Sequence, residues 1–219
     1  MLSLTACNQS KPSKETRFLL DTVVEITIYD DNSKKIIDEL FDKIEDMENK
    51  YSRYVEGSEI SEINSNPGTF VSVSEDTFEL VEHCLYFSAI SDGLFDISIG
   101  PLVDLWDING ENPKVPSRSE IDEAKNKINY RNIAVDRENR AVSVTDGMSI
   151  DPGAVAKGFI TDRLVAVLRE RKINSALLNL GGNLYMLGTK PDGSSWTIGI
   201  RDPYGLQRDY IATVSLKDM

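Results

Sequence analysis

A carboxylate, a glycine and a lysine lie close together in residues 150–158, which read IDPGAVAKG. The apolar residues before Asp151 predict a strand, and those after Lys157 predict a helix over 159–171. Free amides at a helix start attract anions, and a lysine there adds positive charge. A carboxylate beside exposed carbonyls suits a hard cation such as Mg²⁺. The segment predicts either a phosphate and metal site or a plain turn with a surface lysine, and it lacks the GK[ST] ending of a Walker loop.

A second segment places a carboxylate among glycine and apolar residues. Residues 91–106 read SDGLFDISIGPLVDLW, with Asp96 directly after Phe95. An acidic side chain in this position can hydrogen-bond the polar edge of a ring while the phenylalanine lines the ring face. The alternative is a tight turn that leads into the core. The following residues predict irregular structure, because Gly100 and Pro101 interrupt them.

Two further features suit a flat aromatic ligand. Tyr54 lies in a predicted loop beside Arg53, where its ring can stack on such a ligand, although loop tyrosines also serve packing. Gly181 and Gly182 end an apolar strand and permit positive φ angles or a close approach of the backbone. A hairpin or a bulge explains the two glycines equally well.

The sequence shows no recognisable pair of nucleophile and base. Its single histidine, His83, lies in the middle of a predicted helix beside Cys84. A lone histidine there is more often structural than catalytic, and Cys84 fits a small buried hydrophobe. No cluster of cysteine and histidine has the spacing of a zinc site, and no G-x-S-x-G elbow occurs.

The elements that must position these residues are mixed along the chain. Helical periodicity and capping signals predict helices over residues 32–47, 58–64, 74–91, 117–128 and 159–171. Ser117 and Glu120 have the spacing of a capping box at the start of the helix over 117–128. Alternating and β-branched residues predict strands over residues 17–29, 70–73, 133–136, 141–145, 176–180, 184–187, 196–200 and 210–216. The strands over 133–136 and 141–145 are expected to form a hairpin. Because the order lacks a regular βαβ rhythm, we predict an α+β fold of mixed helices and a largely antiparallel sheet.

Composition excludes some classes of partner. The 219 residues carry a formal net charge of −12, with 40% apolar and 27% charged residues. This balance is that of an ordinary globular protein. Its acidity argues against nucleic acid and against docking to anionic lipid through a basic patch.

The N-terminus resembles a bacterial lipobox, because residues 4–7 read LTAC. Cleavage before Cys7 would leave an N-terminal cysteine that carries lipid, and the polar residues after it suit a tether. The alternative is a chance cysteine in a tail. The apolar run is shorter than the ~7–15 residues of a complete h-region. We therefore expect residues 1–16 to be a partial lipoprotein signal peptide and tether, followed by one domain over residues 17–219.

Read in order, several segments resemble motifs of the ApbE family of flavin transferases. The segment FLLDT, followed by VVEI, is similar to the family's opening M-G-T strand. The segment YSRY, followed by SEI and Asn64, is similar to the family's S-x-Y…S-E-I…N. Residues 93–106 resemble G-x-F-D-I-T-x-G-P-L-V-x-L-W, and residues 151–158 resemble D-L-G-x-x-A-K-G, with Asp162 matching a further aspartate. Residues 178–188 are similar to L-x-N-L-G-G-N-x-x-x-x-G, and residues 196–203 to W-x-x-G-I-x-x-P. The resemblance runs from residue 18 to the last residue.

The resemblance implies a T-fold-related, ApbE-like domain that acts as an FAD:protein FMN transferase. Such enzymes use FAD and Mg²⁺ to join FMN through a phosphoester to a Thr or Ser of a target protein, with release of AMP. Some members instead hydrolyse FAD to FMN and AMP. The implied partners are FAD and an acceptor flavoprotein, without nucleic acid. The implied location is the outer face of a bacterial cell membrane, held by lipid on Cys7.

The resemblance also implies roles for single residues. The positions implied to contact FAD are Leu20, Tyr54, Leu94, Phe95, Asp96, Asp151 and Lys157. Ala154 stands where a backbone carbonyl of the family reaches the metal. Leu20 and Asp21 depart from the family's Met and Gly.

The C-terminal end departs furthest from the family pattern. The sequence ends at Met219, before the family's T-S-G-x-Y, H-I-x-D-P and D-A-x-x-T motifs, the last of which supplies metal-binding side chains. We therefore expect an incomplete fold, catalytic residues outside these 219 residues, and no FMN transfer by this chain alone. We also expect strand 210–216 to leave an apolar edge unpaired. A non-catalytic FAD-binding lipoprotein and an FAD pyrophosphatase are the alternative functions.

Overall fold

The computed structural model describes residues 11–108, 110–206 and 209–219, so Cys7 and its predicted lipidation lie outside the described residues. The helices are α1 (Lys34–Tyr51), α2 (Glu59–Ser65), α3 (Glu75–Ile90), α4 (Gly100–Trp106), α5 (Arg118–Lys125), the 3-10 helix η1 (Tyr130–Asn132) and α6 (Gly153–Glu170). The strands are β1 (Ser13–Leu19), β2 (Thr22–Ile28), β3 (Val71–Ser72), β4 (Ala134–Asp136), β5 (Ala141–Ser143), β6 (Ser175–Leu180), β7 (Asn183–Gly188), β8 (Trp196–Arg201) and β9 (Tyr210–Leu216). The named strands pair antiparallel, which confirms the predicted α+β class. No helix in the described ranges is both long and apolar enough to cross a bilayer.

The chain divides into two compact units. Unit 1 comprises residues 1–45 and 160–219, and unit 2 comprises residues 46–159. Helices α1 and α6 each contribute residues to both units.

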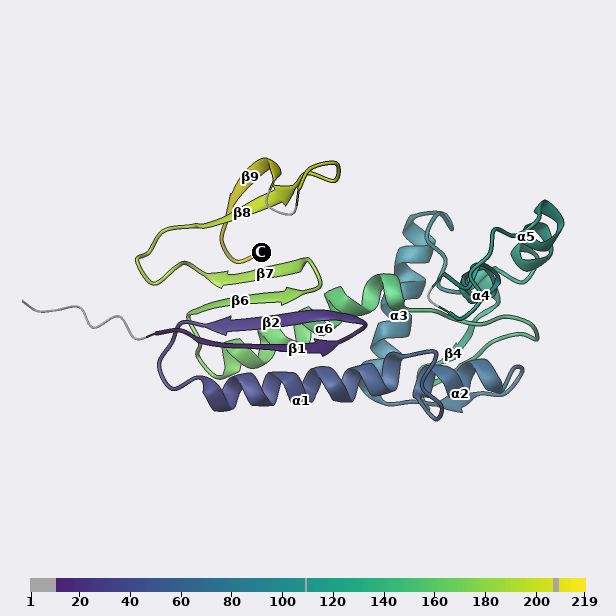
Figure 1. Cartoon of the computed structure of the whole chain (residues 1–219). Coiled ribbons are helices and arrows are strands. Elements are labelled where there is room, and N and C mark those ends of the chain that lie inside the picture. The colour runs from purple at the N-terminus through teal and green to yellow at the C-terminus, as the bar shows by residue number, and fades with distance from the viewer. Residues whose placement is uncertain (1–10, 109, 207–208) are drawn as a thin grey trace, which may run out of the picture. The chain divides into compact units, whose positions relative to one another are not determined.

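Unit 1 is built on a sheet of order β1-β2-β6-β7. Figure 1 shows α1 and α6 running alongside this sheet. The central strands β2 and β6 carry a fully buried row of aliphatic side chains: Val24, Ile26, Ile28, Ala176, Leu178 and Leu180. The helices add Ile37, Leu40, Phe41 and Ile44 from α1, and Ile160, Leu164 and Leu168 from α6. Removing this apolar surface from water is the main force that holds the helices to the sheet.

The prediction of one strand over residues 17–29 is wrong, because this segment is a hairpin. Strands β1 and β2 pair with Leu19 opposite Thr22, so Leu20 and Asp21 form the turn. Their φ angles are 56° and 55°. Two successive positive φ angles give the two-residue turn that matches strand twist, which usually selects Gly or Asn. Asp21 tolerates this conformation but Leu20 does not favour it, so the sequence carried only a weak turn signal.

Gly181 and Gly182 form the turn between β6 and β7. Both have positive φ, 63° and 94°. The Gly182 amide donates to the Asn179 side-chain oxygen at 2.8 Å. The hairpin alternative for these glycines is therefore confirmed.

Strands β8 and β9 form a separate two-stranded sheet within unit 1. Tyr210, Ile211 and Val214 of β9 are exposed. In the part of the chain that the structure describes, β9 pairs with β8 alone, so its other edge is unpaired as predicted.

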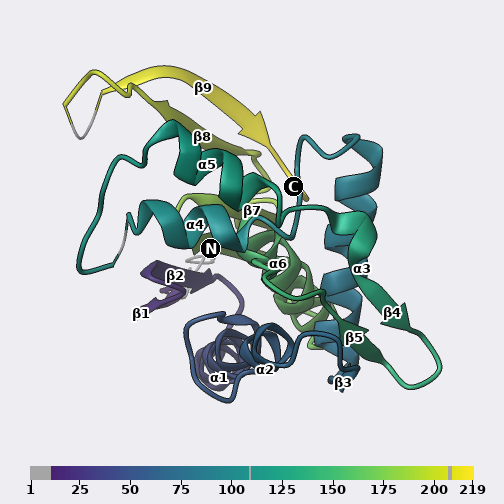
Figure 2. The same ribbon diagram turned by 90° about the vertical axis from the view of Figure 1, so that its right-hand side faces the viewer.

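Unit 2 packs helices around the small sheet of order β3-β5-β4, which Figure 2 shows beside α3. Its core includes Ile60, Ile63, Leu80, Val81, Cys84, Ile97, Val142 and Ile150. The predicted capping box of α5 is present, since Ser117 and Glu120 exchange side-chain and backbone hydrogen bonds. Cys84 is buried as predicted, and burial raises the pKa of its thiol to about 12. It therefore stays an unreactive thiol at neutral pH.

Three predicted boundaries in or beside unit 2 are wrong. The segment predicted to be irregular contains α4, because Pro101 lies in its first turn, where the missing amide costs nothing. Helix α6 begins at Gly153 rather than at residue 159, so the GAVAKG residues are helical. Helix α1 continues to Tyr51, inside the predicted loop.

Candidate functional site

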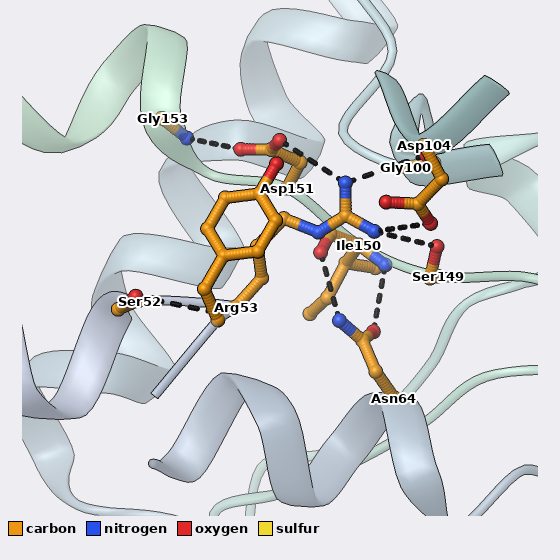
Figure 3. A network of polar contacts seen from close by, with 10 residues as sticks. Ser52, Arg53, Asn64, Gly100, Asp104, Ser149, Ile150, Asp151 and Gly153 are labelled. Atoms are coloured by element: carbon orange, nitrogen blue, oxygen red, sulfur yellow. Dashed lines mark hydrogen bonds and ion pairs between the residues drawn. The ribbon is translucent and has the colours of Figure 1, made fainter. Parts of the chain in front are cut away.

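The turn that carries Asp151 is clamped by a side chain 86 residues earlier. Asn64, on α2, accepts a hydrogen bond from the Ile150 amide at 2.7 Å and donates to the Ile150 carbonyl at 3.0 Å. Figure 3 shows the two bonds side by side. The Asp151 amide donates to the Ile97 carbonyl at 2.8 Å. The backbone on both sides of the Cα of Ile150 is therefore fixed, including the peptide that leads into Asp151.

The Asp151 carboxylate has two partners in the structure. Its Oδ1 accepts from the Gly153 amide at 2.9 Å, at the start of α6. Its Oδ2 lies 3.6 Å from Nη1 of Arg53, and the side chain is 19% exposed. The carboxylate is thus oriented by the chain and still reaches solvent.

The amides at the start of α6 are less available than the sequence suggested. Besides the Gly153 amide, those of Val155 and Ala156 both donate to the Pro152 carbonyl at 2.9 Å. These three amides already have acceptors within the chain, and the anion site predicted for this segment stays a prediction. Lys157 is half-buried on the same helix.

Arg53 is the centre of a polar network in unit 2 (Figure 3). Its Nη2 donates to Asp104 at 2.7 Å and to the Ser149 hydroxyl at 3.4 Å. Its Nη1 donates to the Gly100 carbonyl at 3.3 Å and faces Asp151. The side chain is only 7% exposed. A buried guanidinium is stable only when its donors and charge are matched, and these partners match them.

Gly100 allows the start of α4 to meet the segment that precedes Asp151. The strand predicted there is wrong, since Ser149 forms only an isolated bridge with Ile99. The Gly100 amide donates to the Ser149 carbonyl at 3.2 Å, and a Cβ on Gly100 would collide with Ser149. Only glycine permits so close an approach of two backbones. This contact puts the Gly100 carbonyl within reach of Arg53.

Tyr54 presents its ring beside this network. The Arg53 guanidinium carbon lies 5.2 Å from the ring centroid, a cation–π contact. The residue is nevertheless 70% exposed. Burial raises the pKa of its phenol, and the Arg53 charge opposes that shift, so the phenol stays neutral at physiological pH. An exposed, neutral ring of fixed orientation is suited to stack on a flat ligand.

The three residues 94–96 differ sharply in their surroundings. Leu94 is 96% exposed and Phe95 is half-buried. The Asp96 carboxylate accepts from the Ser98 amide at 2.8 Å, the Ser98 hydroxyl at 2.6 Å and the Tyr130 amide at 3.0 Å. Asp96 therefore joins two loops of unit 2, and its contact with a flavin stays a prediction.

The remaining sites of the sequence prediction fall in two places. Leu20 lies in unit 1, in the turn between β1 and β2. The other residues predicted to contact FAD, and Ala154, lie in unit 2. His83 is exposed, and its Nδ1 lies 2.8 Å from the Glu79 carbonyl of its own helix, so its structural role stays a prediction.

A magnesium site does not form from the described residues by themselves. No group of three or more His, Cys, Asp or Glu side chains in residues 11–108, 110–206 and 209–219 could hold a metal ion. The Asp151 carboxylate already has Gly153 and Arg53 as partners. Magnesium takes about six oxygen ligands in near-octahedral geometry, and water and substrate phosphates often supply several of them. Asp151 and the Ala154 carbonyl would supply only part of such a shell, so the metal site stays a prediction.

An open groove of about 660 Å³ adjoins the Arg53 network in unit 2. It shares Asp104 and Ser149 with that network, and its other walls include Lys114, Glu120 and Lys127. Lys114 and Glu120 pair with each other at 2.7 Å. The groove is open and its charges are largely paired, so it does not enclose a flavin ring.

Sequence reasoning missed the residues that organise the site. In the sequence, Asn64 and Gly100 belonged to motifs, but no role was predicted for either residue. Arg53 was noted only as a neighbour of Tyr54. One signal was present for Asn64: it lies four residues after the buried Ile60, on the same face of a short helix. The partners of Arg53 lie 47 to 98 residues away in the chain, from Gly100 to Asp151, and no local pattern indicates them.

Comparisons with known proteins agree on one family. The family model described as "ApbE family" matches residues 20–219. An FAD:protein FMN transferase of Treponema pallidum is 30% identical over 197 residues, which cover 83% of this chain and 54% of that protein. An FAD:protein FMN transferase of Klebsiella pneumoniae is 33% identical over 161 residues, which cover 73% of this chain and 49% of that protein. The chain therefore spans about half the length of these two curated relatives.

Solved structures support the same fold. The crystal structure of the ApbE protein of Thermotoga maritima matches with a TM-score of 0.88 and 32% identity, over 95% of this chain and 68% of that one. The flavin transferase ApbE of Vibrio cholerae matches with a TM-score of 0.83 and 21% identity, over 95% of this chain and 70% of that one. With a family model that matches residues 20–219 and a fold shared with solved ApbE structures, this chain belongs to the ApbE family.

Proposed function

We propose that this protein is an FAD:protein FMN transferase. Two relatives of 30% and 33% identity carry that name, and the chain belongs to their family. The observation in unit 2 that carries the proposal is the exposed Tyr54 ring, stacked on a buried Arg53 that also faces the fixed Asp151 carboxylate. A stacking ring and an oriented acceptor are what a flavin's face and polar edge need.

The residues present fit FAD better than they fit a metal. Tyr54 and the exposed Leu94 offer flat or apolar surface to the flavin, Asp151 offers a hydrogen-bond acceptor, and Lys157 offers positive charge for the pyrophosphate. Bound FAD supplies the phosphoryl group that the reaction transfers. Dependence on Mg²⁺ belongs to the proposal, because a pyrophosphate under attack accumulates negative charge. The described residues lack a ligand set for that ion, so their part is to bind and orient FAD.

The proposed reaction exchanges the phosphoanhydride bond of FAD for a phosphoester bond to the acceptor. The P–O bond between the FMN phosphate and AMP breaks, and AMP leaves with the bridging oxygen. A new P–O bond forms to the hydroxyl oxygen of a Thr or Ser of an acceptor flavoprotein, whose proton is released. Tyr54 and Asp151 hold the flavin end, and correct positioning is a large part of catalysis in such transfers.

The test uses the protein purified from its own cells, FAD, Mg²⁺ and an acceptor flavoprotein. Mass spectrometry should show an acceptor heavier by one esterified FMN, together with free AMP, and chelation of Mg²⁺ should abolish both. Release of FMN and AMP with an unmodified acceptor would contradict the proposal in favour of an FAD pyrophosphatase. Tight binding of intact FAD without turnover would contradict it in favour of a flavin-binding lipoprotein.

We further propose that the protein is exported and held at the outer face of the cell membrane by lipid on Cys7. Support comes from the LTAC sequence and the polar tether that follows it. An acceptor that works at the membrane would then be within reach. The precursor and its Cys7→Ser variant should differ in detergent partitioning, with the parent in the detergent phase and the variant in the aqueous phase. Equal membrane association of the two would refute the anchor.

A further inference from the structure

The terminal nitrogens of Arg53 are occupied by partners within the chain, although the residue lies beside the proposed flavin site. They face Asp104, Ser149, Gly100 and Asp151, and the side chain is 7% exposed. These partners come from α4 and from residues 149–151, just before α6. A guanidinium held by several partners has a fixed plane, unlike the flexible ammonium of a lysine. A role of Arg53 toward a ligand that leaves this network intact acts through a neighbouring side chain.

Tyr54 is the neighbour that reaches solvent. The residue is 70% exposed, and its ring lies 5.2 Å from the Arg53 guanidinium carbon. Its amide donates to the Ser52 hydroxyl at 3.2 Å, which fixes the backbone of the loop. An exposed tyrosine without such a support samples several rotamers, and ordering them costs binding free energy. The guanidinium is thus a rigid platform under an otherwise exposed ring.

We propose that Arg53 is a positioning residue for the flavin end of FAD. It holds the Tyr54 ring in the orientation that stacks on the isoalloxazine, and it does so without touching FAD. The inference rests on the proposed function, because it takes Tyr54 as the residue that stacks on the flavin. Four partners hold the Arg53 guanidinium, and one of them is the Asp151 carboxylate. The guanidinium in turn lies against the exposed Tyr54 ring.

The test is a double-mutant cycle in the full chain, with FAD affinity and the fluorescence of the bound flavin as readouts. Arg53→Lys keeps the charge but loses the planar fork, so it should weaken FAD binding roughly threefold or more. It should also raise the emission of bound flavin, since stacking on tyrosine quenches it. In a Tyr54→Ala background the same change should have no further effect, because residues that act as a unit are not additive.

Two controls separate positioning from folding. Arg17→Lys changes another arginine that lies over an aromatic ring, 4.4 Å from the Phe41 centroid, and pairs with Glu15 and Asp38. It should leave FAD affinity unchanged. Asp104→Ala removes the closest partner of Arg53 from a half-exposed position, so it keeps the fold and should reproduce the effects of Arg53→Lys at smaller size. This variant keeps the test open if Arg53→Lys fails to fold.

The outcomes separate this inference from the proposed function. A parent chain that does not bind FAD would overturn both. A parent that binds FAD while Arg53→Lys and Asp104→Ala leave affinity and fluorescence unchanged would overturn this inference alone. An equal loss of affinity for Arg53→Lys with and without Tyr54 would show that Arg53 acts on the fold in general, which also overturns it.

Discussion

Asp96 and Asp151 both lie in unit 2, at positions implied to contact FAD, but their surroundings differ. The Asp96 carboxylate accepts three hydrogen bonds, from Ser98 and Tyr130, and so joins two loops. The Asp151 carboxylate accepts one, from Gly153, and faces Arg53 at 3.6 Å. Asp151 is itself positioned by its surroundings, because its amide donates to the Ile97 carbonyl and Asn64 holds the backbone of Ile150. The Asp96 oxygens are used in hydrogen bonds that hold two loops together. The Asp151 carboxylate accepts fewer hydrogen bonds and can still accept one from a ligand.

The largest expected effect is on stability, from Asp96→Ala. The change leaves the Ser98 and Tyr130 amides without their acceptor, so the free energy of unfolding should fall by roughly 2–4 kcal/mol. Urea denaturation of the parent and the variant measures it. Asp92→Asn is the matched control, because Asp92 is exposed and pairs only loosely with Arg131 at 3.2 Å. If the two variants were equally stable, Asp96 would not be a structural residue.

The next effect concerns the clamp that positions Asp151. Asn64→Ala removes both bonds to Ile150, whose buried amide and carbonyl lose their partners, so unfolding should become easier by roughly 1–3 kcal/mol. Asn66→Ala, two residues on, removes one exposed bond to the Glu62 carbonyl and should cost less. Differential scanning calorimetry compares the two. A larger loss for Asn66→Ala would show that the Asp151 turn does not depend on α2.

Asp151→Ala should lower the free energy of unfolding less than Asn64→Ala does, and its main effect should be on FAD binding. One hydrogen bond to a helix amide is lost, at roughly 1 kcal/mol in the free energy of unfolding. FAD affinity should fall about tenfold, as for a lost hydrogen bond to a charged group. Chemical denaturation and FAD titration of the same preparations give both numbers. Loss of stability without loss of affinity would place Asp151 beside Asp96 as a structural residue.

Much of the fold follows from local sequence signals. The capping box at Ser117 and Glu120, the hairpin of β4 and β5, and the buried Cys84 were all predicted from short patterns. Local patterns fail where the chain departs from residue preference. The turn of Leu20 and Asp21 adopts positive φ without glycine, and α6 starts within a segment whose glycines indicated a loop.

The sequence predicted which residues belong to the candidate site, but not the contacts that hold them in place. Tyr54 and Asp151 were identified from their types and from the motifs around them. The contacts that hold them were not, because Arg53 reaches Ser149 across 96 residues and Asn64 reaches Ile150 across 86. Such pairs have no period in the sequence and arise only when the elements pack.

The most direct test of the account is an FAD titration of this chain and its Tyr54→Ala variant, followed by flavin fluorescence. Tyr54 is exposed, so the variant should fold and unfold like the parent. Its FAD affinity should fall roughly fivefold, equivalent to about 1 kcal/mol of stacking, and the quenching of bound flavin should weaken. Equal affinity and equal quenching in the two proteins would contradict the placement of the flavin on Tyr54, and with it the site proposed here.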